Sequence, residues 1–247
     1  VSLAPGSSID VHGTNTVFVK GGQLVLSVNG AVLTTLPSSQ TPGLPETISM
    51  SPGSSIVTSN SGTEPGAEIQ LIASTVEMDG ASISTLTFGP GRGGDVIVTA
   101  GTLHLDGDSG ISTETGFVGR GGDLQLNVGT LTLAEGASLK TLNNDSTGTT
   151  DDEGKVTLGV GGDIIIRGVT GLEGSYATDV TITGRGNFDS SSEIKTENNI
   201  FTFASEFAGG KGGSVRISSE SITLDGGEIN SLTNGFIGPG AEIVLGL

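Results

Sequence analysis

Acidic residues recur directly after Gly-Gly pairs, and basic residues recur directly before such pairs. The acidic set is Asp95, Asp123 and Asp163, and the basic set is Arg92, Arg120 and Lys211. Stacked columns of this kind could bind a metal ion or a polyanion. Because like charges at strand spacing repel, we favour an alternation in which each carboxylate pairs with Arg and accepts hydrogen bonds from the glycine-rich turn. On this interpretation the columns hold a corner of the chain in place.

A second group of carboxylates lies in the segment DSTGTTDDE. Its members are Asp145, Asp151, Asp152 and Glu153. Calcium prefers hard oxygen ligands of this type, but the segment lacks the spacing of an EF-hand, and a solvated acidic loop is the commoner explanation. We expect no cofactor, with calcium at these four residues as the one metal candidate.

The sequence offers little for catalysis. The only histidines are His12 and His104, and His104 alternates with Leu103 and Leu105, which places it on the outer side of a strand. No opposed pair of acids, catalytic triad, phosphate-binding loop or zinc spacing occurs, and aromatic residues that would stack on sugar rings are scarce. We therefore predict no catalytic residues and no enzymatic activity, and we rank a carbohydrate-active enzyme below structural and binding roles.

These residues belong to a repeating unit of three short strands. The first strands of successive units are GGQLVLSV (from Gly21), GAEIQLIA (Gly66), GGDVIVTA (Gly93), GGDLQLNV (Gly121), GGDIIIRG (Gly161), GGSVRISS (Gly212) and GAEIVLGL (Gly240). Each alternates apolar and polar residues, as strands do. A second strand such as TLHLDG follows, and then a third apolar point such as Ile111, before Thr or Ser in most copies. The best-kept spacing, from Asp95 to Asp123, is 28 residues.

The repeat predicts an all-β fold, a right-handed parallel β-helix with about 27–28 residues and three short strands per coil. One unit cannot bury its own apolar face, but stacked units form continuous internal columns. We expect the glycines to supply the positive φ that the corners need. A β-propeller is the main alternative, but its blades are longer and carry aromatic signatures, which these units lack.

The pattern GxGRGGDIxI…LxLxxGaxIsT resembles the repeat region of filamentous-haemagglutinin-like exoproteins, which Gram-negative bacteria secrete by the two-partner route. Residues 65–140 and 209–247 carry the resemblance best. It implies a right-handed β-helix on or outside the cell. It does not extend to that family's N-terminal secretion domain, because no NPNL-type motif is present, and it supports architecture more than any particular function.

We expect a single domain over residues 1–247 with polar insertions near residues 37–47, 143–154 and 195–210. In solenoids such insertions lie outside the coil, often on a binding face. The third insertion contains Phe201, Phe203 and Phe207. These side chains form either a small satellite core against the helix wall or a patch that contacts a partner.

Charge and composition limit the partners. The formal net charge is −17, which argues against nucleic acid and anionic membranes, and no apolar run approaches the length of a membrane-spanning helix. The first residues contain no signal sequence, so we expect a mature product or an excised piece of something longer. Together with the resemblance, these features predict a secreted or cell-surface protein of a Gram-negative bacterium.

Both ends of the chain fall inside a repeat. The C-terminal GAEIVLGL supplies a first strand, and the N-terminal VSLAPGSSIDV supplies a second strand and a third apolar point. The two halves add up to one unit, which predicts a head-to-tail homopolymer or, alternatively, a fragment of a longer array. The expected contact residues are Val1, Leu3, Ile9, Ile243, Leu245 and Leu247. We therefore expect an extracellular rod, stalk, sheath or filament subunit. The alternative is an adhesin that binds a glycan, a cell surface or a host protein.

Overall fold

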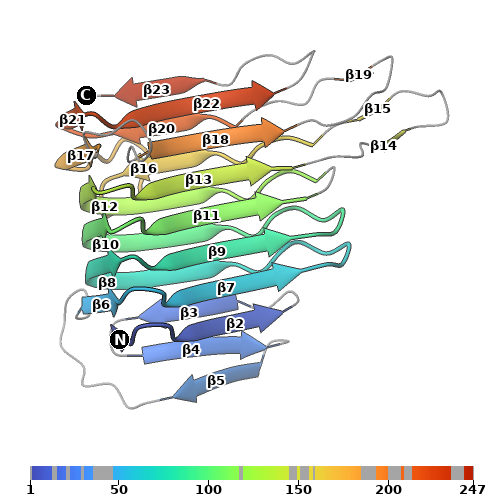
Figure 1. Cartoon of the computed structure of the whole chain (residues 1–247), viewed down its shortest axis with the longest axis horizontal. Helices are drawn as coiled ribbons and strands as arrows, with labels where there is room; N and C mark the ends of the chain where they lie inside the picture. The colour runs from blue at the N-terminus through green and yellow to red at the C-terminus, as the bar shows by residue number, and fades with distance from the viewer. Residues whose placement is uncertain are drawn as a thin grey trace.

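The chain folds as a parallel β-helix, in which short strands wind around a common axis (Figure 1). The computed structural model describes residues 2–12, 16–20, 23–28, 31–35, 47–116, 119–144, 149–150, 156–157, 159–184, 193–199, 207–208, 213–234 and 242–246. Every regular element in these ranges is a strand, and they contain no helix long and apolar enough to cross a membrane. The predicted all-β solenoid is therefore confirmed.

The larger sheet carries the first and second strands of the coils. Three middle coils supply both from one long strand: β8 (Ile69–Asp79), β10 (Val96–Asp106) and β12 (Leu124–Leu133). Other coils supply them separately, as β1 (Ser2–Leu3), β3 (Thr16–Lys20), β6 (Thr47–Met50), β16 (Ile164–Arg167), β17 (Asp179–Thr183), β20 (Val215–Ser218), β21 (Ile222–Asp225) and β23 (Ile243–Gly246). From β8 to β23 all neighbouring strands of this sheet are parallel.

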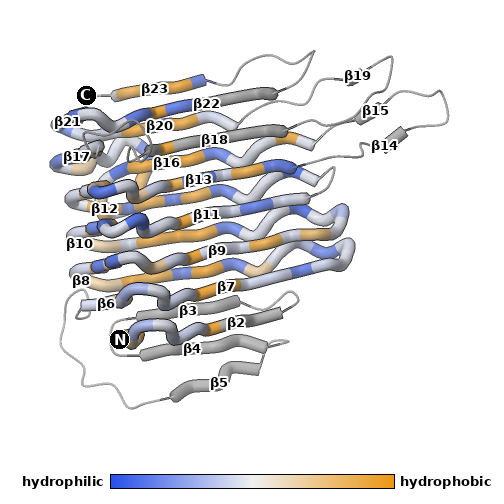
Figure 2. The backbone as a smooth tube through the Cα atoms, in the orientation of Figure 1, coloured by the Kyte–Doolittle hydropathy of each residue, from blue (hydrophilic) through white to orange (hydrophobic). Residues whose placement is uncertain are grey.

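The third strands form a second sheet, which is parallel throughout. Its order is β2 (Ser8–His12), β7 (Ser55–Asn60), β9 (Ser82–Thr87), β11 (Gly110–Thr115), β13 (Ser138–Asn143), β18 (Glu193–Asn199) and β22 (Glu228–Asn234). The apolar core runs as one cluster between the two sheets. Figure 2 shows apolar and polar residues alternating along the strands, as expected where one face of each strand is inside.

Equivalent residues of successive coils stack in columns. Leu126 lies opposite Val98, and Leu139 lies opposite Ile111, in the predicted 28-residue register. Both leucines are completely buried. The column therefore obtains its burial from the coils above and below it.

Glycine serves two kinds of corner. Between the second and third strands it supplies positive φ, as Gly80 does at +55°. At the corner before the first strand the requirement is space, because a Cβ on Gly122 would overlap the carbonyl oxygen of Gly94 in the preceding coil. The prediction that corner glycines supply positive φ is thus correct for the corner between the second and third strands, but not for the corner before the first strand.

The N-terminal end departs from the predicted strand assignment. GGQLVLSV was expected to be a first strand, but the first strand of that coil is β3, which pairs with β8 in parallel. Residues of GGQLVLSV form β4 (Gln23–Val28), which is antiparallel to β3, and β5 (Ala31–Thr35) is antiparallel to β4. The alternation of apolar residues was read correctly as a strand, but it does not specify strand direction.

Some described parts of the predicted insertions lie outside the coils. Parts of the second and third form a small sheet from β14 (Thr149–Thr150), β15 (Val156–Thr157) and β19 (Phe207–Ala208), which projects beyond one edge of the solenoid (Figure 1). Residues 195–199 belong to β18, so the third insertion begins later than predicted. The structure adds an insertion that the repeat analysis missed, at residues 168–178 between β16 and β17. Of the expected insertion at 37–47, only Thr47 lies within the described residues.

Candidate functional site

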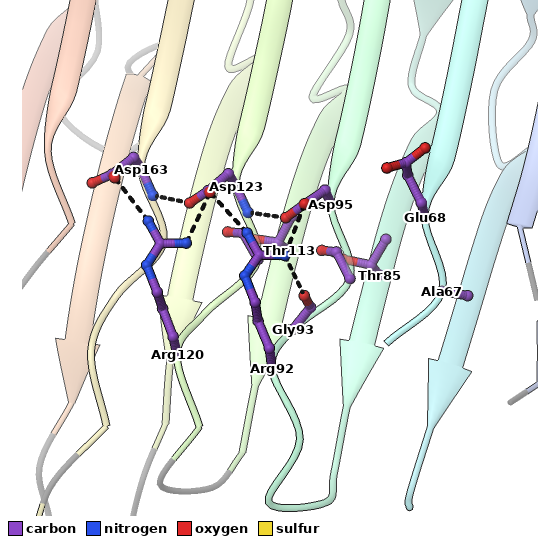
Figure 3. Close-up of polar contacts among 12 residues, drawn as sticks. Ala67, Glu68, Thr85, Arg92, Gly93, Asp95, Thr113, Arg120, Asp123 and Asp163 are labelled. Carbon is purple, nitrogen blue, oxygen red and sulfur yellow. Dashed lines mark hydrogen bonds and ion pairs between the residues drawn. The ribbon is translucent and has the colours of Figure 1, made fainter. Parts of the chain in front are cut away.

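The predicted charge columns meet as a ladder along one corner of the solenoid where they are described (Figure 3), and Lys211 lies outside the described residues. Arg92 donates to Asp95 and to Asp123 of the next coil, each at 2.8 Å. Arg120 repeats the arrangement one coil further, donating to Asp123 and Asp163 at 2.8 Å. Each guanidinium therefore joins two successive coils.

The carboxylates also bind the backbone of the following coil. The backbone N–H of Asp123 donates to Oδ1 of Asp95, and the N–H of Asp163 donates to Oδ1 of Asp123, each at 2.7 Å. The N–H of Ser214 donates in the same way to Asp163. The series of aspartates ends there, since Ser214 takes the next equivalent position. These contacts agree with the interpretation that the columns hold a corner in place.

The electrostatics of the ladder favour a structural role. The hydrogen bond that Arg92 donates to Asp95 raises the pKa of Arg92, and the bond that Arg120 donates to Asp123 raises the pKa of Arg120. Both oxygens of Asp123 are occupied, one by two guanidinium groups and the other by a backbone N–H. A metal ion at Asp123 would therefore compete with these partners for the carboxylate. The ladder is thus a clamp between coils whose carboxylates already bind other groups of the protein.

A second ladder lies inside the core, and the sequence analysis did not assign it a role. In the coils that contain β7, β9, β11, β13 and β22, one hydroxyl donates to the carbonyl oxygen of a glycine-rich corner. The donors are Thr58, Thr85, Thr113, Thr141 and Ser231. The signal for it was present, because each hydroxyl residue stands two positions after the third apolar point of its unit. The periodic Thr is therefore an internal hydrogen-bond donor rather than a surface site.

Polar residues also end the third strands on the inner side. Asn143 donates to the carbonyl oxygens of Gly119 and Val160 across the corner. In the two preceding coils the equivalent residues are Thr87 and Thr115, whose buried hydroxyl oxygens have no hydrogen-bond partner among the described residues. The inner corner therefore contains both satisfied and unsatisfied polar groups.

Outside the charge ladder, the described residues with catalytic or metal-binding chemistry are dispersed. His104 is on the outer side of β10, as predicted, between Glu77 and Thr132 of the neighbouring coils. Among the described residues no group of three or more His, Cys, Asp and Glu side chains could hold a metal ion. The calcium candidates Asp145, Asp151, Asp152 and Glu153 lie outside the side chains that the structure describes, so calcium binding stays a prediction.

The remaining predicted contact residues are only partly described. Phe201 and Phe203 lie outside the described residues, and Phe207 is placed by its backbone in β19. Leu3 and Ile9 pack against the N-terminal end of the core. Ile243 and Leu245 lie at the opposite end and are exposed (Figure 1). Val1 and Leu247 lie outside the described residues.

Comparison with known proteins leaves the chain without an assigned family: no family model, no curated protein and no solved structure matches it. The resemblance to filamentous-haemagglutinin-like repeats therefore stays a prediction from the sequence pattern.

Proposed function

We propose that the chain is a non-enzymatic, extracellular structural β-helix that serves as an element of a rod or filament. The observation that carries this proposal is the column of apolar residues that continues from coil to coil as far as the last described strand, β23. Ile243 and Leu245 are 43% and 49% exposed, whereas their partners Val215 and Ile217 in the preceding coil are 0% and 1% exposed. A further coil stacked on β23 would cover them.

Two repeated features support a rod. The second sheet is parallel throughout, the larger sheet is parallel from β8 to β23, and the charge and hydroxyl ladders join successive coils in the middle of the chain. Every contact type is therefore repeated along one direction, which is the property of an element that extends. The net charge of −17 and the resemblance to secreted exoproteins favour an extracellular location.

The proposal is tested by association of the purified chain at its C-terminal end. We expect the concentrated chain to associate head to tail, measured by sedimentation velocity and electron microscopy. Leu245→Lys should stop this association, because it places a charge in the stacked core. Val244→Lys is the matched control, because Val244 belongs to the outward column beside Arg216 and should leave association intact. Equal association of the two variants, or none in the unaltered chain, would count against the proposal.

An adhesin is the second candidate, and the insertion at residues 168–178 favours it. This loop presents Leu172, which is 68% exposed, and Tyr176, which is 49% exposed. Backbone bonds from Gly171 to Gly168 and from Ser175 to Leu172 hold the loop in a defined conformation. A rigid loop with an exposed aromatic ring is suited to contact a glycan or protein surface. Retention on a glycan array that is lost in Tyr176→Ala but kept in Leu245→Lys would favour this function.

A further inference from the structure

The loop between β16 and β17 is an insertion into one coil. Arg167 at the end of β16 lies opposite Asn127, 40 positions earlier. Asp179 at the start of β17 lies opposite Thr130, 49 positions earlier, although β12 crosses the same place without interruption. Residues 168–176 are thus added to this coil, and the next residue returns to the buried core.

The insertion is closed at its base and folds back over the outer side of β12. The N–H of Gly168 donates to the carbonyl oxygen of Ser175 at 3.3 Å. Gly171, at φ +66°, lies so close to Asn127 that an added Cβ would be 3.1 Å from the carbon of its side-chain amide. Asn127 alternates with inward-facing residues of β12 and yet is only 6% exposed, because the insertion lies against it.

Two arginines and a tyrosine lie together at the base of the insertion. Arg167 and Tyr176 stand directly before and after the two residues whose hydrogen bond closes it. The N–H of Ala177 donates at 2.9 Å to the carbonyl oxygen of Ser218, two residues after Arg216 on β20. β16 and β20 are neighbours in the larger sheet, and Arg216 lies opposite the residue two positions before Arg167 (Figure 1). The strand neighbours of both arginines are buried, so both arginines are on the outer side of the sheet.

These two arginines differ from the arginines of the charge ladder, because neither forms an ion pair with a carboxylate of the described residues. Arg167 makes one hydrogen bond there, from its Nε to Oδ1 of Asn127 at 3.0 Å, which leaves its two terminal nitrogens for another partner. Arg216 is exposed and makes no side-chain hydrogen bond within the part of the chain that the structure describes. A guanidinium keeps its charge at every physiological pH, and its planar fork matches a carboxylate through two parallel hydrogen bonds. In a chain with a net charge of −17, the two arginines form a local site for an anion.

The surroundings of the arginines favour an acidic glycan over other anionic polymers. Tyr176 is 49% exposed, so its ring can pack against the apolar face of a sugar while its hydroxyl stays in water. β16 is paired on both edges, with β12 and β20, and β20 is paired with β16 and β23, so a peptide finds no free strand edge here. The net charge opposes nucleic acid, whose phosphates would meet repulsion over the rest of the surface.

We propose that Arg167, Arg216 and Tyr176 form a binding site for a polysaccharide that carries carboxylates, such as a polymer of uronic acids. Each arginine binds the carboxylate of one sugar unit, and the tyrosine ring packs against a sugar ring between or beside them. Because the arginines belong to successive coils, a polymer with repeated carboxylates can engage both at once. The inference rests on the adhesin candidate and adds the chemical class of its ligand.

The test is isothermal titration of the full chain with polygalacturonate, and with the same polymer after its carboxylates have been methyl-esterified. We expect binding of the first polymer and none of the second. Arg216→Gln should weaken binding about tenfold or more, and so should Arg167→Gln. Lys140→Gln is the matched control, because it removes the same charge from the outer side of the second sheet and should leave binding unchanged.

The tyrosine is tested separately from the charges. Tyr176→Ala should weaken binding about fivefold to tenfold, because it removes the ring, whereas Tyr176→Phe keeps the ring and should bind as the unaltered chain does. Circular dichroism and thermal unfolding confirm that each variant is folded. Arg216→Gln keeps the proposal testable if Arg167→Gln lowers stability, because Arg216 makes no side-chain bond to the described residues.

Several results would overturn the proposal. No binding of polygalacturonate, equal binding of its methyl ester, or an equal loss in Lys140→Gln and Arg216→Gln would each do so. Polyglutamate that binds as tightly as polygalacturonate would show that a protein chain satisfies the site and would overturn the glycan. Tighter binding of dextran sulfate would overturn the carboxylate.

The outcomes also separate this inference from the functions on which the article rests. Retention on a neutral glycan that needs Tyr176 but neither arginine would overturn the acidic ligand and leave the adhesin candidate standing. The rod proposal depends on association of the chain with itself, so a loss of glycan binding in Arg216→Gln would leave that proposal unchanged.

Discussion

Leu126 in a middle coil and Leu245 in the last described strand belong to one column of the solenoid but lie in opposite environments. Ile166 and Ile217 connect them by successive strand pairing. Leu126 is completely buried, whereas Leu245 is 49% exposed. The residue type is the same, so the difference comes from the number of neighbouring coils. In a solenoid a coil supplies the apolar side chains, and its neighbours supply their burial.

The largest expected difference in stability comes from placing a charge at position 126 or at position 245. Leu126→Asp places an unpaired carboxylate in the sealed core and should lower the free energy of unfolding by about 4 kcal/mol or more. Leu245→Asp should cost less than about 1 kcal/mol in the monomer, because its side chain already meets water. Urea unfolding followed by circular dichroism measures both. Similar losses in the two variants would show that the end coil is as closed as the middle one.

Replacing a glycine by alanine in the same two regions should give a smaller difference in stability. Gly122→Ala forces a Cβ into the carbonyl oxygen of Gly94 and should cost about 3 kcal/mol, since backbone of two coils must move apart. At Gly246 the nearest atom to an added Cβ is 3.8 Å away, so Gly246→Ala should change stability by about 0.5 kcal/mol at most. Thermal unfolding of the Gly122→Ala and Gly246→Ala variants measures the two stability changes. A stable Gly122→Ala chain would contradict the close approach of the corners.

The charge ladder should contribute less than the core. Asp123→Ala removes the acceptor of two guanidinium groups and one backbone N–H, with an expected loss of about 2 kcal/mol. The ion pairs are partly exposed and screened, so most of this loss should persist in high salt through the backbone bond.

The folded state raises the pKa of both arginines, so their contribution is present at lower pH and disappears only above the usual titration range of Arg. Between about pH 6 and 9, the arginines should therefore add no pH dependence to the loss of stability caused by Asp123→Ala. A loss that vanishes completely in high salt would assign the ladder to ion pairing alone.

The smallest effect concerns two buried threonines of one strand. Thr113 donates to the carbonyl oxygen of Gly122 at 2.6 Å, so Thr113→Val should cost about 1 kcal/mol. The hydroxyl of Thr115 has no partner among the described residues, so Thr115→Val should be neutral or slightly stabilising. Differential scanning calorimetry of the pair measures the difference. A larger loss for Thr115→Val would point to a partner for its hydroxyl beyond the described residues.

Much of the regular part of this fold could be predicted from the residues. The 28-residue register placed Leu126 beside Val98, and the Gly-Gly-Asp pattern identified the clamp corner in which Asp123 lies. These predictions succeed because local alternation and repeated spacing are properties of the chain itself. The internal role of Thr113 was missed, because a hydroxyl at a buried position looks like a turn residue until its acceptor is known.

The sequence alone determined that the chain repeats a three-strand unit, which residues of the unit are apolar, and where acids and bases alternate. Only the tertiary structure decided the direction of β4, the pairing of β15 with β19, and the hydrogen-bonded loop at residues 168–178. An alternating strand has the same pattern whether it pairs in parallel or antiparallel, so its direction depends on the edge that is free beside it. The exposure of Leu245 has a similar origin, because a core residue is buried only where a neighbouring coil covers it.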